Sequence, residues 1–356
     1  MLANAFHMFS RSLRVRTKGF KEYKGDAYQI CEQIIANCWN GEFFQASTGH
    51  FSQFWCRDFG MQVESLRKLG WKSEVRKTLE YAVNTFARAR RVTTTIDHGR
   101  LFEFPSFAPD SLAFLLLSLS VAKQKKLVME HADFFQQAIS DFVARVINKN
   151  TSLVREHVHF SSMKDHAIRS SSCYDNVMAA IVARESKKLG IQCSYVFPKK
   201  LFLRSFWNGS FFQDETKLPT VIAGDANVFP FWSEVITKKS MCCSSIRAMQ
   251  DAGLDKPFPL KYTAHPPKHG LIWQSVFAPN YQGTAIWTLL GGCYLRMLKQ
   301  VSTSEFNAAC AQYASIIEKH KTFLEVLNPD GTPFKTAFYV TDEGMLWAAN
   351  FLALRG

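Results

Sequence analysis

The stretch "FWCRDFGMQVESLRKLGWKSEVRKTLEYAVNTFARA" (residues 54–89) holds two amphipathic helical patterns separated by a tight turn. Apolar residues recur at spacings of three and four over 58–70 and again over 74–89. The turn "GWKS" (70–73) that joins them is short. Two helices with so short a connection pack side by side in opposite directions, so the stretch predicts an αα-hairpin.

The same helical period continues along the chain. Tight turns alternate with long, aromatic connections at 207–232 and 258–281, which predicts stacked hairpins with one functional face. Because no linker composition interrupts the pattern, we expect a basic N-terminal extension (1–25) followed by a single all-α domain (26–356). The further helices are predicted at 26–39, 109–123, 130–147, 175–190, 196–206, 240–252, 282–300, 304–324 and 342–354, about eleven in all.

The composition narrows the class of protein. Apolar residues make up 47% of 356 and aromatic residues 14%, which suits aromatic walls around a cavity. The net charge of +13 is spread singly and no nucleic-acid-binding motif occurs, so we expect no nucleic-acid partner, although an anionic substrate fits. Nine cysteines without a CxxC pair, no signal sequence and no span of ~18 apolar residues predict a cytoplasmic protein without a membrane partner.

Three aspartates begin predicted helices, and each follows an aromatic residue. An aspartate at a helix start is stabilised by the helix dipole by ~0.3–1 kcal/mol, so each one is explained by capping alone. Capping needs no aromatic neighbour, however, whereas sugars bind through aromatic faces together with carboxylates and arginines. The three pairs are Trp55–Asp58, Phe107–Asp110 and Tyr174–Asp175.

Hydrolysis of a glycosidic bond needs two carboxyl groups, one as acid and one as base. A second candidate stands in "FLEVLNPDGTPF" (323–334), where Glu325 follows an apolar helix and precedes a turn signal. On spacing alone, Glu325 is equally well explained as a surface residue at a helix end.

These motifs, in this order, resemble the six-hairpin glycosidases, the (α/α)6 barrels that include glucoamylases, trehalases, processing α-glucosidases and neutral invertases. "FWCRDFG" looks like their W-x-R-D segment, which implies that Arg57 and Asp58 hold the sugar beside Trp55. "SSSCYDNVMAA" is similar to the trehalase S-G-W-D segment, which implies that Asp175 is the general acid. The Trp and Gly of that segment are Tyr174 and Cys173 here.

Two further segments extend the resemblance over about 26–356. "FLEVLNPDGTPF" looks like the E-Y-Y-x-P-x-T-G segment, with valine and leucine in place of its tyrosines, and implies that Glu325 is the general base. "FPSFAPDSLAFLLL" resembles the D-S-x-x-W segment of the invertases, which keeps Asp110 as a competing acid or a sugar ligand. The resemblance implies a toroid of about twelve helices.

The implied reaction is inverting hydrolysis of a small glycoside or oligosaccharide. Asp175 and Glu325 would lie ~6.5–9.5 Å apart, and no metal or organic cofactor is needed. We also expect Tyr174, His265 and Trp273 to contact the carbohydrate.

Two alternatives stay open at this stage. His265 and His269 in "YTAHPPKHGLIW" keep a sugar epimerase or isomerase on an α/α barrel possible, because such sites shuttle protons through histidines. A non-catalytic carbohydrate-binding barrel is the other alternative. The oligomeric state is not predicted.

Overall fold

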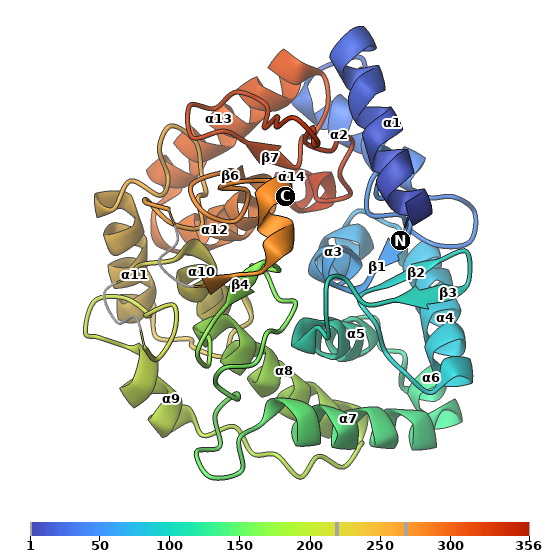
Figure 1. Ribbon diagram of the computed structural model, residues 1–356, viewed down its shortest axis with the longest axis vertical. Helices are drawn as coiled ribbons and strands as arrows, with labels where there is room; N and C mark the ends of the chain where they lie inside the picture. The colour runs from blue at the N-terminus through green and yellow to red at the C-terminus, as the bar shows by residue number, and fades with distance from the viewer. Residues whose placement is uncertain (1, 218–220, 267–269, 356) are drawn as a thin grey trace.

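A computed structural model describes residues 2–217, 221–266 and 270–355, and these residues are mostly helical (Figure 1). The α-helices are α1 (Leu2–Lys18), α2 (Ala27–Cys38), α3 (Cys56–Lys68), α4 (Lys72–Ala89), α5 (Pro109–Val121), α6 (Lys125–Glu130), α7 (Ala132–Val146), α8 (Cys173–Leu189), α9 (Lys199–Phe206), α10 (Gly224–Trp232), α11 (Lys239–Asp251), α12 (Thr288–Val301), α13 (Thr303–His320) and α14 (Ala348–Ala353). A 3-10 helix, η1, covers Trp273–Phe277.

Six of these helices form an inner ring. Each of α3, α5, α8, α10, α12 and α14 contacts the next, and α14 returns to α3, which closes the ring. The helices α2, α4, α7, α9, α11 and α13 lie outside it (Figure 1). The predicted all-α toroid of about twelve helices is therefore confirmed, with α1 and the short α6 in addition.

The sequence of α5, "PDSLAFLLLSLSV", explains why it lies in the inner ring. Ten of its 13 residues are buried, so the helix is apolar on every side and must pack against neighbours all round. Its neighbour α3 offers Gly60, where an added Cβ would lie 2.5 Å from the Cβ of Phe114. The missing side chain lets the two helices approach closely.

Short antiparallel strands surround the start of the inner helices. Strands β1 (Phe54–Trp55), β2 (Thr95–Asp97) and β3 (Arg100–Phe102) form one sheet, with Phe54 opposite Ile96 and Ile96 opposite Leu101. Two further pairs join β4 (Ala167–Ile168) to β5 (Gly270–Leu271) and β6 (Ile286–Trp287) to β7 (Val326–Leu327). Because β1 runs directly into α3 and β6 into α12, the strands fix where these helices begin.

Several predicted boundaries were wrong. The helices predicted at 282–300 and 342–354 begin only at Thr288 and Ala348, and their first residues form turns and a strand. The predicted loop 207–232 contains the inner helix α10, which its internal Pro230 disguised in the sequence. The basic segment 1–25 contains α1, whose docking is described below.

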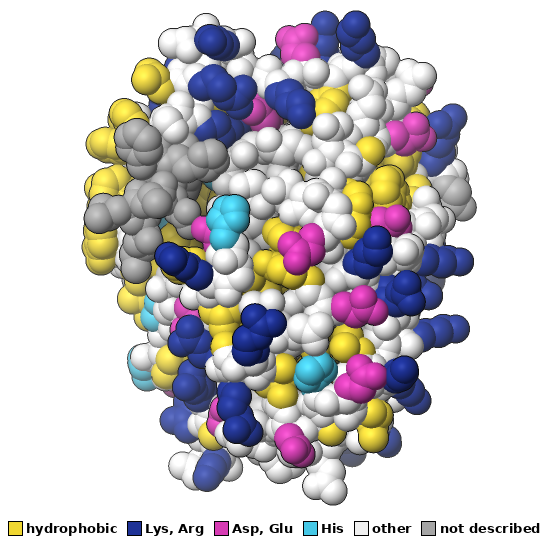
Figure 2. Space-filling model, turned by 90° about the vertical axis from the view of Figure 1, so that its right-hand side faces the viewer, with side chains coloured by type: hydrophobic (Ala, Val, Ile, Leu, Met, Phe, Trp, Pro, Cys, Tyr) yellow, Lys and Arg dark blue, Asp and Glu magenta, His cyan; other side chains and the backbone are white. Residues whose placement is uncertain are grey.

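Charged side chains are dispersed over the surface. On the face shown in Figure 2, Lys and Arg alternate with Asp and Glu instead of forming a continuous stripe. Within the part of the chain that the structure describes, no helix is both long and apolar enough to cross a membrane.

Candidate active site

A cavity lies where α3, α12 and α14 begin, inside the helical ring. Its walls are aromatic, and they enclose three carboxyl groups. The lining residues are Phe51, Trp55, Arg57, Asp58, Phe104, Met163, Asp165, His166, Tyr262, Tyr281, Gln282, Trp287, Leu289, Glu325 and Trp347. A hollow on the outer surface, at the end of α8, has Glu234 as the one carboxylate among its lining residues.

The cavity is small in this conformation, about 80 Å³. Sites for drug-sized ligands are roughly 300–1,000 Å³, so a ligand of that size does not fit this conformation. Phe104, which is 45% exposed and packs edge-on against Trp55, is the most exposed aromatic side chain of the lining.

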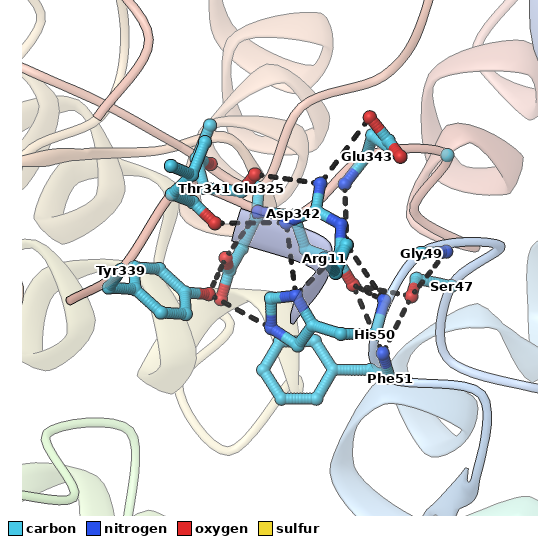
Figure 3. Close-up of polar contacts among 12 residues, drawn as sticks. Arg11, Ser47, Gly49, His50, Phe51, Glu325, Tyr339, Thr341, Asp342 and Glu343 are labelled. Atoms are coloured by element: carbon cyan, nitrogen blue, oxygen red, sulfur yellow. Dashed lines mark hydrogen bonds and ion pairs between the residues drawn. The ribbon is translucent and has the colours of Figure 1, made fainter. Parts of the chain in front are cut away.

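Glu325 is a deeply buried carboxyl of the cavity, and only 2% of it is exposed. Tyr281 donates a hydrogen bond to Oε1, while the hydroxyl of Tyr339 (2.5 Å) and the backbone N–H of Asp342 (3.0 Å) donate to Oε2. Figure 3 shows the last two approaching it from one segment. Burial and the charge of Asp342 outweigh these three donors and raise the pKa of Glu325 to about 7.

Asp58 lies in the first turn of α3, as predicted, and faces the same cavity. The indole N–H of Trp347 donates to its Oδ1 over 2.8 Å. Burial raises the pKa of Asp58 to about 6, although Arg57 and this hydrogen bond act in the opposite direction. Asp58 and Glu325 therefore both change protonation near neutral pH.

Arg57 is already occupied by carboxylates of the protein. Its Nε lies 2.6 Å from Oδ2 of Asp110, and its Nη2 lies 3.0 Å from Oδ1 of Asp165. Asp165 also accepts hydrogen bonds from Ser161 (2.7 Å) and Gln282 (3.1 Å). Because Tyr281 and Gln282 are consecutive, one dipeptide contacts Glu325 on one side and Asp165 on the other.

Asp110 and Tyr174 lie behind Arg57 and not among the residues that line the cavity. Asp110 is fully buried, and its Oδ2 accepts a second hydrogen bond from the Tyr174 hydroxyl over 2.8 Å. Burial raises the pKa of Asp110. Both residues thus contact the cavity only through Arg57.

Asp175, the acid implied by the sequence, lies in the first turn of α8, whose N-cap is Ser172. It is 3% exposed, and its two oxygens accept hydrogen bonds from Ser162 and Ser172, each over 2.5 Å. Its own N–H donates to Ser172 Oγ (3.0 Å), so Ser172 caps the helix. Burial raises the pKa of Asp175, but Asp175 does not line the cavity that contains Glu325.

The two remaining predicted contacts also lie outside the cavity lining. His265 is exposed and Trp273 is 69% exposed, whereas His269 falls outside the described residues. The histidine that lines the cavity is His166, whose pKa is lowered mainly by burial.

The sequence analysis missed cavity residues on the non-helical connections. The main ones are Asp165, His166, Tyr281, Gln282, Trp287 and Trp347. The one feature of the sequence that could have identified Asp165 and His166 was "KDH" (164–166), three ionisable residues inside a Ser-rich stretch without helical period.

A buried ionic cluster holds the connection that carries Asp165. Lys164 Nζ lies 2.6 Å from Asp214, and Arg169 Nη1 lies 2.9 Å from both Asp214 and Asp225. The Lys164 side chain is fully buried, so Asp165 follows an anchored residue. Over the described ranges, no group of three His, Cys, Asp or Glu side chains is placed to hold a metal ion.

No protein-family model matches the sequence, and no curated protein matches it. Solved structures do match. A GH63 mannosylglycerate hydrolase from Thermus thermophilus is similar over 92% of this chain and 99% of its own, with a TM-score of 0.65 and 9% identity. The chain has the (α/α)6-barrel fold of the glycosidases.

Two further structures share this fold at low identity. A glycosidase is similar over 99% of this chain and 96% of its own (TM-score 0.61, 11% identity). A rhamnosidase from Klebsiella oxytoca with rhamnose bound is similar over 94% of this chain (TM-score 0.63, 12% identity). This chain spans 64% of the rhamnosidase chain.

Proposed function

We propose that this protein is a glycoside hydrolase that works by inversion, with Glu325 as general base and Asp58 as general acid. The observation that carries the proposal is that two carboxyls with raised pKa line one aromatic-walled cavity. Asp58 takes the role first expected of Asp175, because Asp58 lines the cavity with Glu325 and Asp175 does not.

In this mechanism a sugar ring lies against Trp55 and Trp287 with its glycosidic oxygen toward Asp58. Protonated Asp58 donates to the leaving oxygen while Glu325 removes a proton from the attacking water. Tyr281 and Tyr339 keep Glu325 oriented, because both donate to it. Asp165 and Gln282 are placed to accept from and donate to sugar hydroxyls.

The charges of the cavity favour a neutral sugar. The lining has three carboxyls, and its arginine is already paired with Asp110 and Asp165. An anionic substrate would therefore meet net negative charge, despite the positive charge of the whole chain.

The test is a screen of nitrophenyl glycosides and natural disaccharides with wild type, Glu325→Gln, Asp58→Asn, Asp165→Asn and Asp175→Asn. We expect turnover of at least one neutral glycoside, with losses of about 10²–10⁴ in Glu325→Gln and Asp58→Asn. Proton NMR of the first product should show the inverted anomer. The proposal would be contradicted if wild type and all variants hydrolysed no glycoside, or if all hydrolysed it at the same rate.

His166 supports a second candidate, the sugar epimerase or isomerase. It lines the cavity and its lowered pKa leaves it neutral near pH 7, as a proton shuttle requires. His166→Gln would then abolish epimerisation while Glu325→Gln retained it. Sugar binding without turnover in any variant would indicate a carbohydrate-binding barrel instead.

A further inference from the structure

Three arginines join the N-terminal helix α1 to the barrel: Arg11 is buried, whereas Arg14, which pairs with Glu343, and Arg16, which donates to the carbonyl of Thr336, are exposed. Arg11 is 5% exposed, and it donates from Nη1 to the carbonyl of Val340 and from Nη2 to that of Thr341, each over 3.0 Å. Its Nε also lies 3.2 Å from Asp342 Oδ1, and Nη2 lies 3.4 Å from Glu343. One guanidinium thus contacts four consecutive residues (Figure 3).

The segment that Arg11 holds is the segment that holds Glu325. Tyr339 and Asp342 donate to the Glu325 carboxyl, and the N–H of Glu325 donates to the carbonyl of Asp342 over 3.0 Å. Thr341 also contacts the residue after Glu325, because its Oγ1 accepts a hydrogen bond from the N–H of Val326 over 2.8 Å. Arg11 therefore lies directly behind the donors of Glu325.

His50 makes a second connection between Arg11 and Glu325. Arg11 Nη1 lies 3.1 Å from His50 Nδ1, and His50 Nε2 lies 3.3 Å from the Tyr339 hydroxyl. The same Nδ1 lies 3.3 Å from Asp342 Oδ1, so this ring nitrogen lies between the Arg11 guanidinium and the Asp342 carboxylate. Tyr339 in turn donates to Glu325 (Figure 3).

We propose that Arg11 is a positioning residue for Glu325, so that the N-terminal helix is part of the active site. The proposal rests on the proposed function for its catalytic meaning, and on the contacts above for its geometry. The basic segment that the sequence suggested to be an extension would then support the base from behind.

The charges around Glu325 determine whether loss of Arg11 raises or lowers the pKa of Glu325. Glu325 is faced by the hydroxyls of Tyr281 and Tyr339 and by the carboxylate of Asp342. The carboxylate of Asp342 is faced in turn by Arg11 from α1, by Ser47 and His50 from the loop before β1, and by the neighbouring Glu343. Without Arg11, less of the negative charge of Asp342 is neutralised, so Asp342 raises the pKa of Glu325 further.

The experiment is a ¹³C NMR titration of the Glu325 carboxyl, with its resonance assigned by its absence in Glu325→Gln. Arg11→Met should raise the pKa of Glu325 by about one unit, as loss of a nearby unit charge does. Arg11→Lys, which keeps the charge, should return most of the shift. Lys18→Met, which removes a charge from an exposed position of the same helix, should titrate as wild type.

The double variant Arg11→Met/Asp342→Asn guards against loss of folding, because it leaves no unpaired carboxylate at residue 342. Its Glu325 pKa should fall below the wild-type value, a reversal that general damage to the fold does not produce. An unchanged Glu325 pKa in folded Arg11→Met, or no reversal in the double variant, would overturn the proposal.

The titration needs no substrate, so the two proposals fail separately. If the predicted shifts occur and no glycoside is hydrolysed, Arg11 positions Glu325 but the proposed function is wrong. If hydrolysis depends on Glu325 but the pKa of Glu325 is the same in wild type and Arg11→Met, the further inference is wrong.

Discussion

Replacing Glu325 by glutamine should stabilise the protein, and only at high pH. The folded pKa of Glu325 is about 7 against 4.5 for an ordinary glutamate. The folded state thus binds the proton more tightly than the unfolded state, so the free energy of unfolding falls as the pH rises from 4.5 to 7. About 2.5 pKa units correspond to about 3 kcal/mol, fully expressed above pH 7 and absent below 4.5.

The assay is thermal unfolding of wild type and Glu325→Gln at pH 4.5 and pH 8. A gain of about 3 kcal/mol corresponds to roughly 4 °C in Tm for a chain of this length, so the variant should melt about 4 °C above wild type at pH 8. At pH 4.5 the two should melt together. Glu32→Gln, at an exposed position, is the control and should show no pH-dependent difference. A Glu325→Gln variant whose relative Tm is the same at both pH values would refute the reasoning.

Three further outcomes follow from the same geometry. Activity needs Glu325 ionised and Asp58 protonated, and because the pKa of Asp58 (about 6) lies below that of Glu325 (about 7) only a minority of molecules is in this state at any pH, so kcat/KM should show a narrow bell with its maximum at about pH 6.5; a broad plateau from pH 5 to 8 would contradict it. Trp347→Phe removes a donor that lowers the pKa of Asp58, so the bell should extend to higher pH, and a shift to lower pH would be inconsistent with this role. Lys164→Met removes one partner from a buried ionic cluster and should cost about 3–5 kcal/mol in urea unfolding, whereas a neutral result would show that the cluster does not anchor the Asp165 connection.

The helical period predicted the ring well where a helix is buried on all sides. The pattern of 109–123 gave α5 nearly to the residue, since apolar residues on all sides of the helix leave few alternatives to a buried helix. It failed at 282–287, because Gln282 and Trp287 line the cavity from turn and strand conformations. Apolar side chains that line a cavity can recur along the sequence at the same spacings as the apolar face of a helix.

The candidate site was only partly predictable for a related reason. Asp58 and Glu325 stand beside recognisable motifs, and both line the cavity. Asp165 has no motif, because its place depends on a connection anchored by Lys164 to residues about 50 positions away. Asp175 matched a motif, yet it does not line the cavity, and its oxygens accept hydrogen bonds from Ser162 and Ser172 that no local pattern reveals.

The central claim is that Asp58 and Glu325 act as acid and base on a glycoside. The most direct measurement compares Asp58→Asn on two substrates of the same sugar, an alkyl glycoside that needs protonation and a glycosyl fluoride that does not. We predict that the variant loses at least about 100-fold on the alkyl glycoside and stays within about tenfold of wild type on the fluoride. Equal losses on both substrates, or this selectivity appearing in Asp165→Asn or Asp175→Asn instead, would contradict the account.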